Sequence, residues 1–121
     1  MGAGVLIAVG LLGGLGAIGR FLLDGAVAAR AGNGFPWGTL AVNLSGALAL
    51  GVLVGAEVGG DALRLVGVGL LGAYTTFSTW MFESQRLAED GQLRRGLANL
   101  LVSLVLGVAV AYIGRELGGW L

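Results

Sequence analysis

The chain has 121 residues, a length that fits one domain. Hydrophobic residues make up 56% of it and charged residues only 12%. Soluble domains carry roughly 25% charged residues, and a small soluble fold could not bury this much apolar surface. Because cysteine and histidine are absent, a disulfide framework, a thiol nucleophile and the commonest metal ligand are excluded. The zero net charge argues against nucleic acid as a partner. The high hydrophobic content predicts a membrane protein surrounded by lipid.

Four uncharged stretches lie between the charged residues, at 1–19, 31–56, 65–82 and 96–114. A membrane-spanning helix needs about 20 mostly apolar residues, so each stretch is long enough. We therefore predict an all-α membrane protein, a single four-helix domain over residues 1–121, with spans at about 3–23, 38–56, 63–82 and 96–114. Four spans place both termini on one side of the membrane. The short connection at 57–64 predicts that the second and third spans form a tight antiparallel pair.

The first span ends in two charges, Arg20 and Asp24, at the i, i+4 spacing that suits an ion pair on a helix. The first and third spans run in the same direction, so Glu83 comes to the same side of the membrane as Arg20. We interpret the three charges as structural, with Arg20 in an ion pair with Asp24 or Glu83.

The arginines give only a weak orientation signal. Arg64 and Arg115 lie on the side of the termini. A larger group lies on the other side: Arg30, Arg86, Arg94 and Arg95, with Arg20 near a span end. By the positive-inside rule this difference leans towards external termini. It is small enough to permit insertion in both orientations.

Polar residues in the second and fourth spans continue into small residues. Thr39, Asn43, Ala47, Gly51 and Gly55 recur every four residues and share one helical face, and Gly-x-x-x-Gly is typical of close helix contact. The fourth span repeats this design with Asn99, Ser103, Gly107 and Ala111. These side chains serve either packing or transport. For Asn43 we favour transport, because an amide in hydrocarbon needs a partner, whereas Asn99 and Ser103 stay open.

The third span carries a run of hydroxyl residues at its middle. Residues 72–80 read Gly-Ala-Tyr-Thr-Thr-Phe-Ser-Thr-Trp, and the midpoint of 65–82 falls between Ala73 and Tyr74. Gly72 and the β-branched Thr75 and Thr76 weaken a helix there. We predict a third helix broken near the bilayer centre, which would expose backbone carbonyls to ions. The alternative is an intact helix whose hydroxyls bond back to its own carbonyls.

The interior of the spans offers only neutral donors. No Asp, Glu or Arg lies at the centre of any span, whereas proton-coupled transporters normally have an ionisable group there. The candidates are the Asn43 amide, the hydroxyls, and the ring edges of Phe77 and Trp80, which are positive. Together they suit a small dehydrated anion that must bind weakly enough to leave.

Three motifs resemble the Fluc fluoride channels, also called the CrcB-type family: Gly-Ala-Ile-Gly-Arg-Phe at 16–21, Gly-Thr-Leu-Ala-Val-Asn at 38–43 and Thr-Thr-Phe-Ser-Thr at 75–79. Their order and spacing agree with that family over essentially the whole chain. The resemblance implies passive export of fluoride, and with it fluoride resistance, across the inner membrane of a prokaryote. It also implies a dual-topology dimer in which the partner is a second, inverted copy of the chain, with two pores.

The resemblance also implies the site residues. Asn43 matches the pore asparagine and Phe77 the first phenylalanine whose ring edge faces fluoride. Trp80 stands where the family usually has a second phenylalanine, and its indole is larger and adds an N–H donor. The implied pore hydroxyls are Thr76, Ser78, Thr79 and Ser103, and Arg20 matches a vestibule arginine. The backbone carbonyls of Gly72 and Thr75 match those that hold a structural sodium ion.

Three other functions remain as alternatives. A small multidrug-resistance-type proton-coupled exporter has a similar length, but it needs a carboxylate within the first span, and Asp24 lies at the end of that span. A non-transporting membrane assembly subunit would leave the clustered hydroxyls of the third span unexplained. An enzyme is the least supported, since no nucleophile–base pair or metal cluster is visible in the sequence. A partner that is a homologous second chain, in place of an identical one, also stays open.

Overall fold

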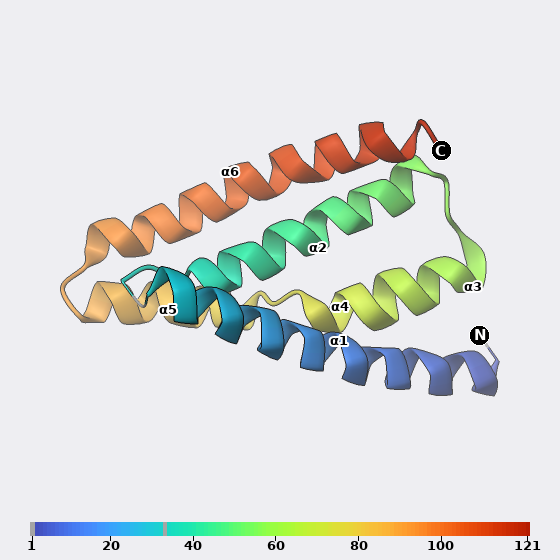
Figure 1. The fold of residues 1–121 in the computed structure, drawn as a ribbon, viewed down its shortest axis with the longest axis horizontal. Coiled ribbons are helices and arrows are strands. Elements are labelled where there is room, and N and C mark those ends of the chain that lie inside the picture. The colour runs from blue at the N-terminus through green and yellow to red at the C-terminus, as the bar shows by residue number, and fades with distance from the viewer. Residues whose placement is uncertain (1, 33) are drawn as a thin grey trace.

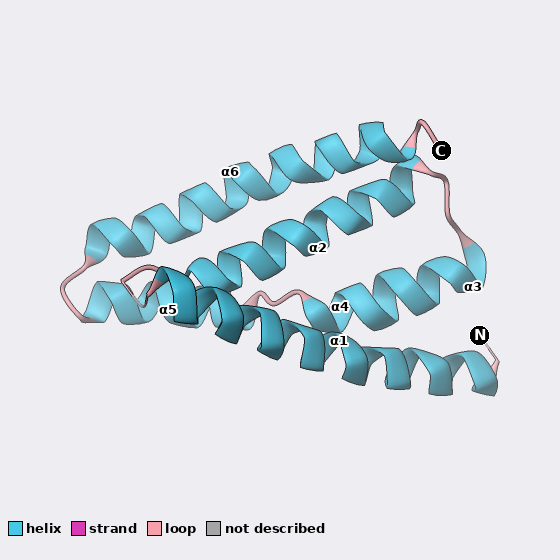
Figure 2. Cartoon of the chain, viewed as in Figure 1, coloured by secondary structure: helices cyan, strands magenta, loops and turns pink. Residues whose placement is uncertain are grey.

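The computed structural model describes residues 2–32 and 34–121, and this part of the chain is helical throughout, without strands. Figures 1 and 2 show long helices joined by short connections. In chain order the elements are α1 (Ala3–Ala31), α2 (Trp37–Gly55), α3 (Gly60–Ala62), the π-helix η1 (Leu63–Leu71), α4 (Gly72–Tyr74), α5 (Ser78–Glu89) and α6 (Leu93–Gly118).

Four helical segments are long and apolar enough to cross a membrane: Ala3–Ala31, Trp37–Gly55, Gly60–Glu89 and Leu93–Gly118. Their length and hydropathy make the chain a multi-pass membrane protein. Both termini and the connection between α2 and α3 lie at one end of the bundle, and the other two connections lie at the opposite end (Figure 1).

Glycines bring α2 and α6 into close contact along their length. A Cβ atom at Gly55 would lie 1.9 Å from the Arg115 carbonyl oxygen, and one at Gly114 would lie 2.3 Å from that of Leu48. Such backbone approach is the packing that small residues allow between membrane helices. The predicted tight pairing of the second and third spans is wrong, because α2 packs most extensively on α6 and less on the third segment.

Replacement of Gly114 by alanine is expected to destabilise the bundle by about 1–3 kcal/mol, the usual cost of overpacking. The added methyl would clash with the backbone of α2, which cannot move aside as a flexible side chain can. The matched control is Gly10→Ala, because a Cβ at Gly10 meets nothing within 4 Å. Thermal unfolding in detergent, followed by the loss of helical signal, should show a clear drop for Gly114→Ala only. Equal unfolding temperatures for the two variants would contradict this packing account.

The first half of the third segment is a π-helix, which the sequence did not predict. The N–H of Gly72 donates to the carbonyl of Gly67, five residues earlier. This element packs on α1, where a Cβ at Gly16 would lie 2.2 Å from the Leu70 carbonyl oxygen. π-helical turns are rare and occur often at functional sites. Here the π-helix leads directly into α4 and the residues that follow it.

Candidate functional site

The third segment is interrupted between α4 and α5, in the pink stretch of Figure 2. Thr75 has an extended backbone, with φ −80° and ψ 160°. Its N–H and its hydroxyl each donate to the Leu71 carbonyl at 3.0 Å. The N–H of Thr76 would donate to the Gly72 carbonyl in an uninterrupted helix, but it donates to Asn43 instead. The interruption therefore takes from Gly72 the donor that a continuous helix would supply.

Asn43 holds the interrupted backbone with both ends of its amide. Its Oδ1 accepts the Thr76 N–H at 2.9 Å, and its Nδ2 donates to the Thr76 carbonyl at 2.8 Å. These bonds satisfy backbone groups that would be costly to leave unpaired in a membrane. An asparagine Nδ2 has two N–H donors, and the hydrogen bonds of the described residues engage one of them. The other is available to a ligand.

Hydroxyls stabilise the start of α5. Thr76 Oγ1 accepts the N–H of Thr79 at 3.2 Å, so it caps a donor that has no partner within the helix. Thr76 Oγ1 also donates to Thr79 Oγ1 at 3.1 Å. Ser78, between them, is exposed. The hydroxyl run of the sequence thus marks both the interruption and the new helix start.

An open groove of about 400 Å³ runs beside the interruption. It brings together five predicted pore residues and the two residues matched to a sodium site: Asn43, Thr76, Phe77, Trp80 and Ser103, with Gly72 and Thr75. All of its lining residues are uncharged. The Phe77 and Trp80 rings meet edge to face, with centroids 5.6 Å apart and planes at 83°. Phe77 is 68% exposed, so its ring projects from the chain into this open face.

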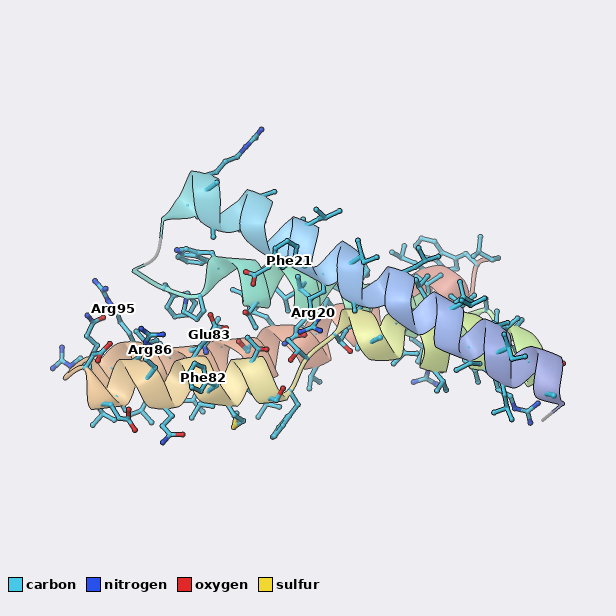
Figure 3. The ribbon with its side chains drawn as sticks, turned by 90° about the horizontal axis from the view of Figure 1, so that it is seen from below. Arg20, Phe21, Phe82, Glu83, Arg86 and Arg95 are labelled. Carbon is cyan, nitrogen blue, oxygen red and sulfur yellow. The ribbon has the colours of Figure 1, made fainter. Side chains whose placement is uncertain are left out.

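Arg20 lies in a second, smaller cavity of about 140 Å³. Figure 3 shows its side chain beneath α1. The cavity is also lined by Asp24 and by Thr39, Thr76 and Thr79, so a guanidinium, a carboxylate and three threonines share it. The Nε atom of Arg20 is buried and has no hydrogen-bond partner among the described residues. The unpaired Nε donor of Arg20 is the group here that suits an anion, since the Thr39 hydroxyl donates to Glu83 and the Thr76 hydroxyl to Thr79.

The predicted ion pair of Arg20 with Asp24 or Glu83 is wrong. Within residues 2–32 and 34–121, the ion pair present is the exposed one between Arg64 and Asp61. Glu83 accepts a hydrogen bond from the Thr39 hydroxyl instead. The i, i+4 spacing permits a pair on one helix, but it does not decide where two long side chains point once other helices pack around them.

Asn99 is fully buried away from the groove and belongs to a packing network. Its Nδ2 donates to the Ser84 hydroxyl at 2.8 Å, and its backbone carbonyl accepts the Trp80 indole N–H at 3.0 Å. The extra N–H donor of Trp80 is therefore already engaged. Sequence reasoning left Asn99 open and missed Ser84, although Ser84 follows Trp80 at the helical spacing of four. Ser103 lines the groove, with its hydroxyl 3.4 Å from Asn99 Oδ1.

Comparison with known proteins connects this arrangement to one family. A family described as "CrcB-like protein, Camphor Resistance (CrcB)" matches residues 7–115. A relative from Mycolicibacterium paratuberculosis, named "Fluoride-specific ion channel FluC 2", is 57% identical over 113 residues, which are 93% of each chain.

Two further relatives show the same breadth of similarity. One from Mycobacterium tuberculosis strain H37Rv, also named "Fluoride-specific ion channel FluC 2", is 53% identical over 92% of this chain and 88% of its own. One from Nocardia farcinica, named "Fluoride-specific ion channel FluC 1", is 45% identical over 98% of this chain and 84% of its own. Because the family match and these identities extend over nearly the whole chain, the chain belongs to the CrcB family.

Proposed function

We propose that this chain forms a fluoride channel through which fluoride leaves the cytoplasm passively, across the inner membrane of a prokaryote. The observation that carries the proposal is the uncharged groove, where an amide, hydroxyls and two aromatic rings converge beside an interrupted helix. The names of the relatives supply the anion, since each is called fluoride-specific. The same channel would give the cell resistance to fluoride.

Neutral donors would replace the water around fluoride in the groove. The free N–H of Asn43 and the positive edges of Phe77 and Trp80 are of the right kind. The hydroxyls of Thr76 and Ser103 now donate to Thr79 and Asn99 and would rotate to donate to the ion. Ser78 and Thr79 would continue this path at the start of α5. The groove holds no fixed positive charge, so the ion is bound weakly enough to leave.

Arg20 would act at the vestibule, before the ion enters the groove. Its cavity shares Thr76 with the groove, so the two spaces meet at one residue. The unpaired guanidinium Nε–H would attract an anion, while the Asp24 carboxylate on the same cavity offsets part of the positive charge. With the Thr79 hydroxyl beside it, the anion would exchange water for protein donors in steps.

The partner proposed is a second copy of the chain in inverted orientation. The groove is open along one face and Phe77 is largely exposed on it, so a covering surface would complete the path. An open groove lined by Asn43 and hydroxyls would be unfavourable against lipid. The weak arginine bias permits both orientations. Two copies related by a two-fold axis would form two equivalent pores.

A sodium ion fits the interruption as a structural cofactor. The carbonyl of Gly72 loses the donor of a continuous helix, because the Thr76 N–H is bound to Asn43, and the extended Thr75 turns the chain out of the helical path. Oxygen ligands suit a hard cation. The Gly72 and Thr75 carbonyls of both copies would hold the ion, which would keep the two subunits in register.

No specific contact among the described residues favours either alternative, the multidrug exporter or the non-transporting subunit. A proton-coupled multidrug exporter would need a carboxylate in the path, and none lines the groove. A non-transporting subunit would not explain the free donor of Asn43. The test is anion efflux from liposomes that hold the purified chain alone: fluoride without chloride supports the channel, and no fluoride efflux overturns it.

Both orientations are expected in equal amounts. The chain has no cysteine, so a single cysteine in place of Gln92, in the connection between α5 and α6, gives a clean label. A membrane-impermeant thiol reagent should label about half of the chains from outside intact vesicles and the rest after the vesicles are opened. A cysteine at Gly59, at the opposite end of the bundle, is the matched position and should give the same ratio. Labelling from one side only would instead point to a homologous chain as the inverted partner.

A further inference from the structure

The indole of Trp80, a residue of α5, is held by a hydrogen bond to the neighbouring helix α6. Its Nε1–H donates to the backbone carbonyl of Asn99 on α6 at 3.0 Å. A carbonyl oxygen has two lone pairs, so it can accept this bond beside its helical one. The indole N–H is a donor that must be paired when buried. The bond therefore fixes how far, and at what angle, the ring stands from α6.

The side chain of Asn99 fixes the distance between the two helices at that point. Nδ2 donates to Ser84 Oγ at 2.8 Å, and Ser84 Oγ donates to the Trp80 carbonyl at 2.8 Å. Asn99 is 0% exposed and Ser84 is 5% exposed. Gly96 permits this approach, because a Cβ there would lie 2.8 Å from the Ser84 carbonyl oxygen. The bonds form a closed cycle through Trp80, Ser84 and Asn99.

This cycle lies behind the aromatic pair of the groove. The Trp80 ring lines the groove and meets Phe77 edge to face, whereas Asn99 and Ser84 are absent from the groove lining. A displacement of the indole would change which part of the Phe77 ring faces the path. In the single chain Phe77 is 68% exposed, and the ring that it meets is that of Trp80.

We infer that Asn99, together with Ser84, is a positioning residue that sets the orientation of the Trp80–Phe77 pair and thereby the selectivity for fluoride over chloride. This inference rests on the proposed channel function. It also explains how an indole occupies a position on the path: the backbone carbonyl of Asn99 accepts the N–H and keeps it out of the groove, and the Asn99 amide holds that carbonyl in place through Ser84.

The test compares Asn99→Leu, which branches at the same atom and lacks the amide, in two backgrounds. In the native background, the fluoride-to-chloride efflux ratio of reconstituted liposomes should fall about tenfold, as expected when a positioned group moves by about 1 Å. In the Trp80→Phe background the ring has no N–H bond to the Asn99 carbonyl, so a shift of α6 is not passed on to it. Asn99→Leu should then change the ratio by less than about twofold. An equal fall in both backgrounds, or no fall in either, overturns the inference.

A spectroscopic measurement separates this inference from the channel itself. With Trp37→Phe and Trp120→Phe, Trp80 is the one tryptophan left, and the tryptophan fluorescence comes from it alone. Asn99→Leu should increase the quenching of its fluorescence by acrylamide, and Ser84→Ala should do so to a smaller extent. If the wild-type chain carries no fluoride but this quenching shifts, the proposed function fails while the positioning holds.

Unchanged quenching in both variants overturns the positioning even where fluoride efflux is normal. Should Asn99→Leu fail to assemble, Ser84→Ala, which deletes one hydroxyl from the same cycle, decides the question with the same two readouts.

Discussion

Asn43→Asp is expected to lower fluoride efflux by about tenfold or more, which corresponds to roughly 1.4 kcal/mol of added barrier. The carboxylate can still accept the Thr76 N–H, but it replaces the donor to the Thr76 carbonyl with a second oxygen. That oxygen repels both the carbonyl and an approaching anion in a medium of low dielectric constant. Efflux from liposomes and the elution volume in detergent measure transport and assembly separately.

The matched control for this variant is Ser45→Ala on the same helix. The Ser45 hydroxyl bonds to Val42 and Tyr74 and does not touch the Thr76 peptide. Its efflux should stay within about twofold of the wild type, as for most exposed substitutions. Normal efflux for Asn43→Asp would contradict the assignment of Asn43 to the fluoride path. Loss of assembly together with efflux would make Asn43 a packing residue.

Phe77→Ile is expected to abolish most fluoride efflux while the protein still folds and assembles. Isoleucine keeps an apolar side chain of similar reach but has no ring edge with positive charge. Because Phe77 is 68% exposed in the single chain, the subunit does not depend on its burial for stability. The expected loss is again about tenfold or more, equivalent to about 1.4 kcal/mol.

Phe82→Ile provides the comparison for Phe77→Ile. Phe82 lies on α5, which begins directly after Phe77, and is 61% exposed. It lines another cavity, of about 630 Å³, together with Glu83 and Arg86, which lie near it in Figure 3. The same chemical change there should leave efflux nearly unchanged. Equal losses in the two variants would show that the loss of any ring in this part of the chain lowers efflux, and would contradict an assignment of Phe77 to the path.

The positions of charged residues were enough to predict four helical segments, because a charge in hydrocarbon is costly and therefore limits each span. They were not enough to predict which helices pack together. The contact of α2 with α6 depends on Gly51 and Gly55 lying against the backbone of Ala111 and Arg115, and on Gly114 and Gly118 lying against that of Leu48 and Val52. Such a match between distant segments has no signature in local sequence. The π-helical turns of η1 likewise depend on packing against α1.

The residues that gather at the candidate site could be predicted from the sequence more readily than the hydrogen bonds between them. The hydroxyl run at 72–80 pointed to the region where the helix stops, since glycine and β-branched residues weaken a helix. That Asn43 binds the peptide of Thr76, and that Arg20 forms no ion pair with Asp24 or Glu83 among the described residues, follow from how separate helices meet. Residue spacing within one helix does not contain that information.

The most direct test of a passive fluoride channel is ion efflux from liposomes that contain the purified chain and equal fluoride and chloride. A potassium ionophore removes the charge imbalance, and ion-selective electrodes follow both anions. The account predicts that fluoride leaves and chloride stays, at a rate that does not change when a proton gradient is imposed, because no ionisable group lines the groove. Retention of fluoride, or efflux that requires the proton gradient, would contradict it.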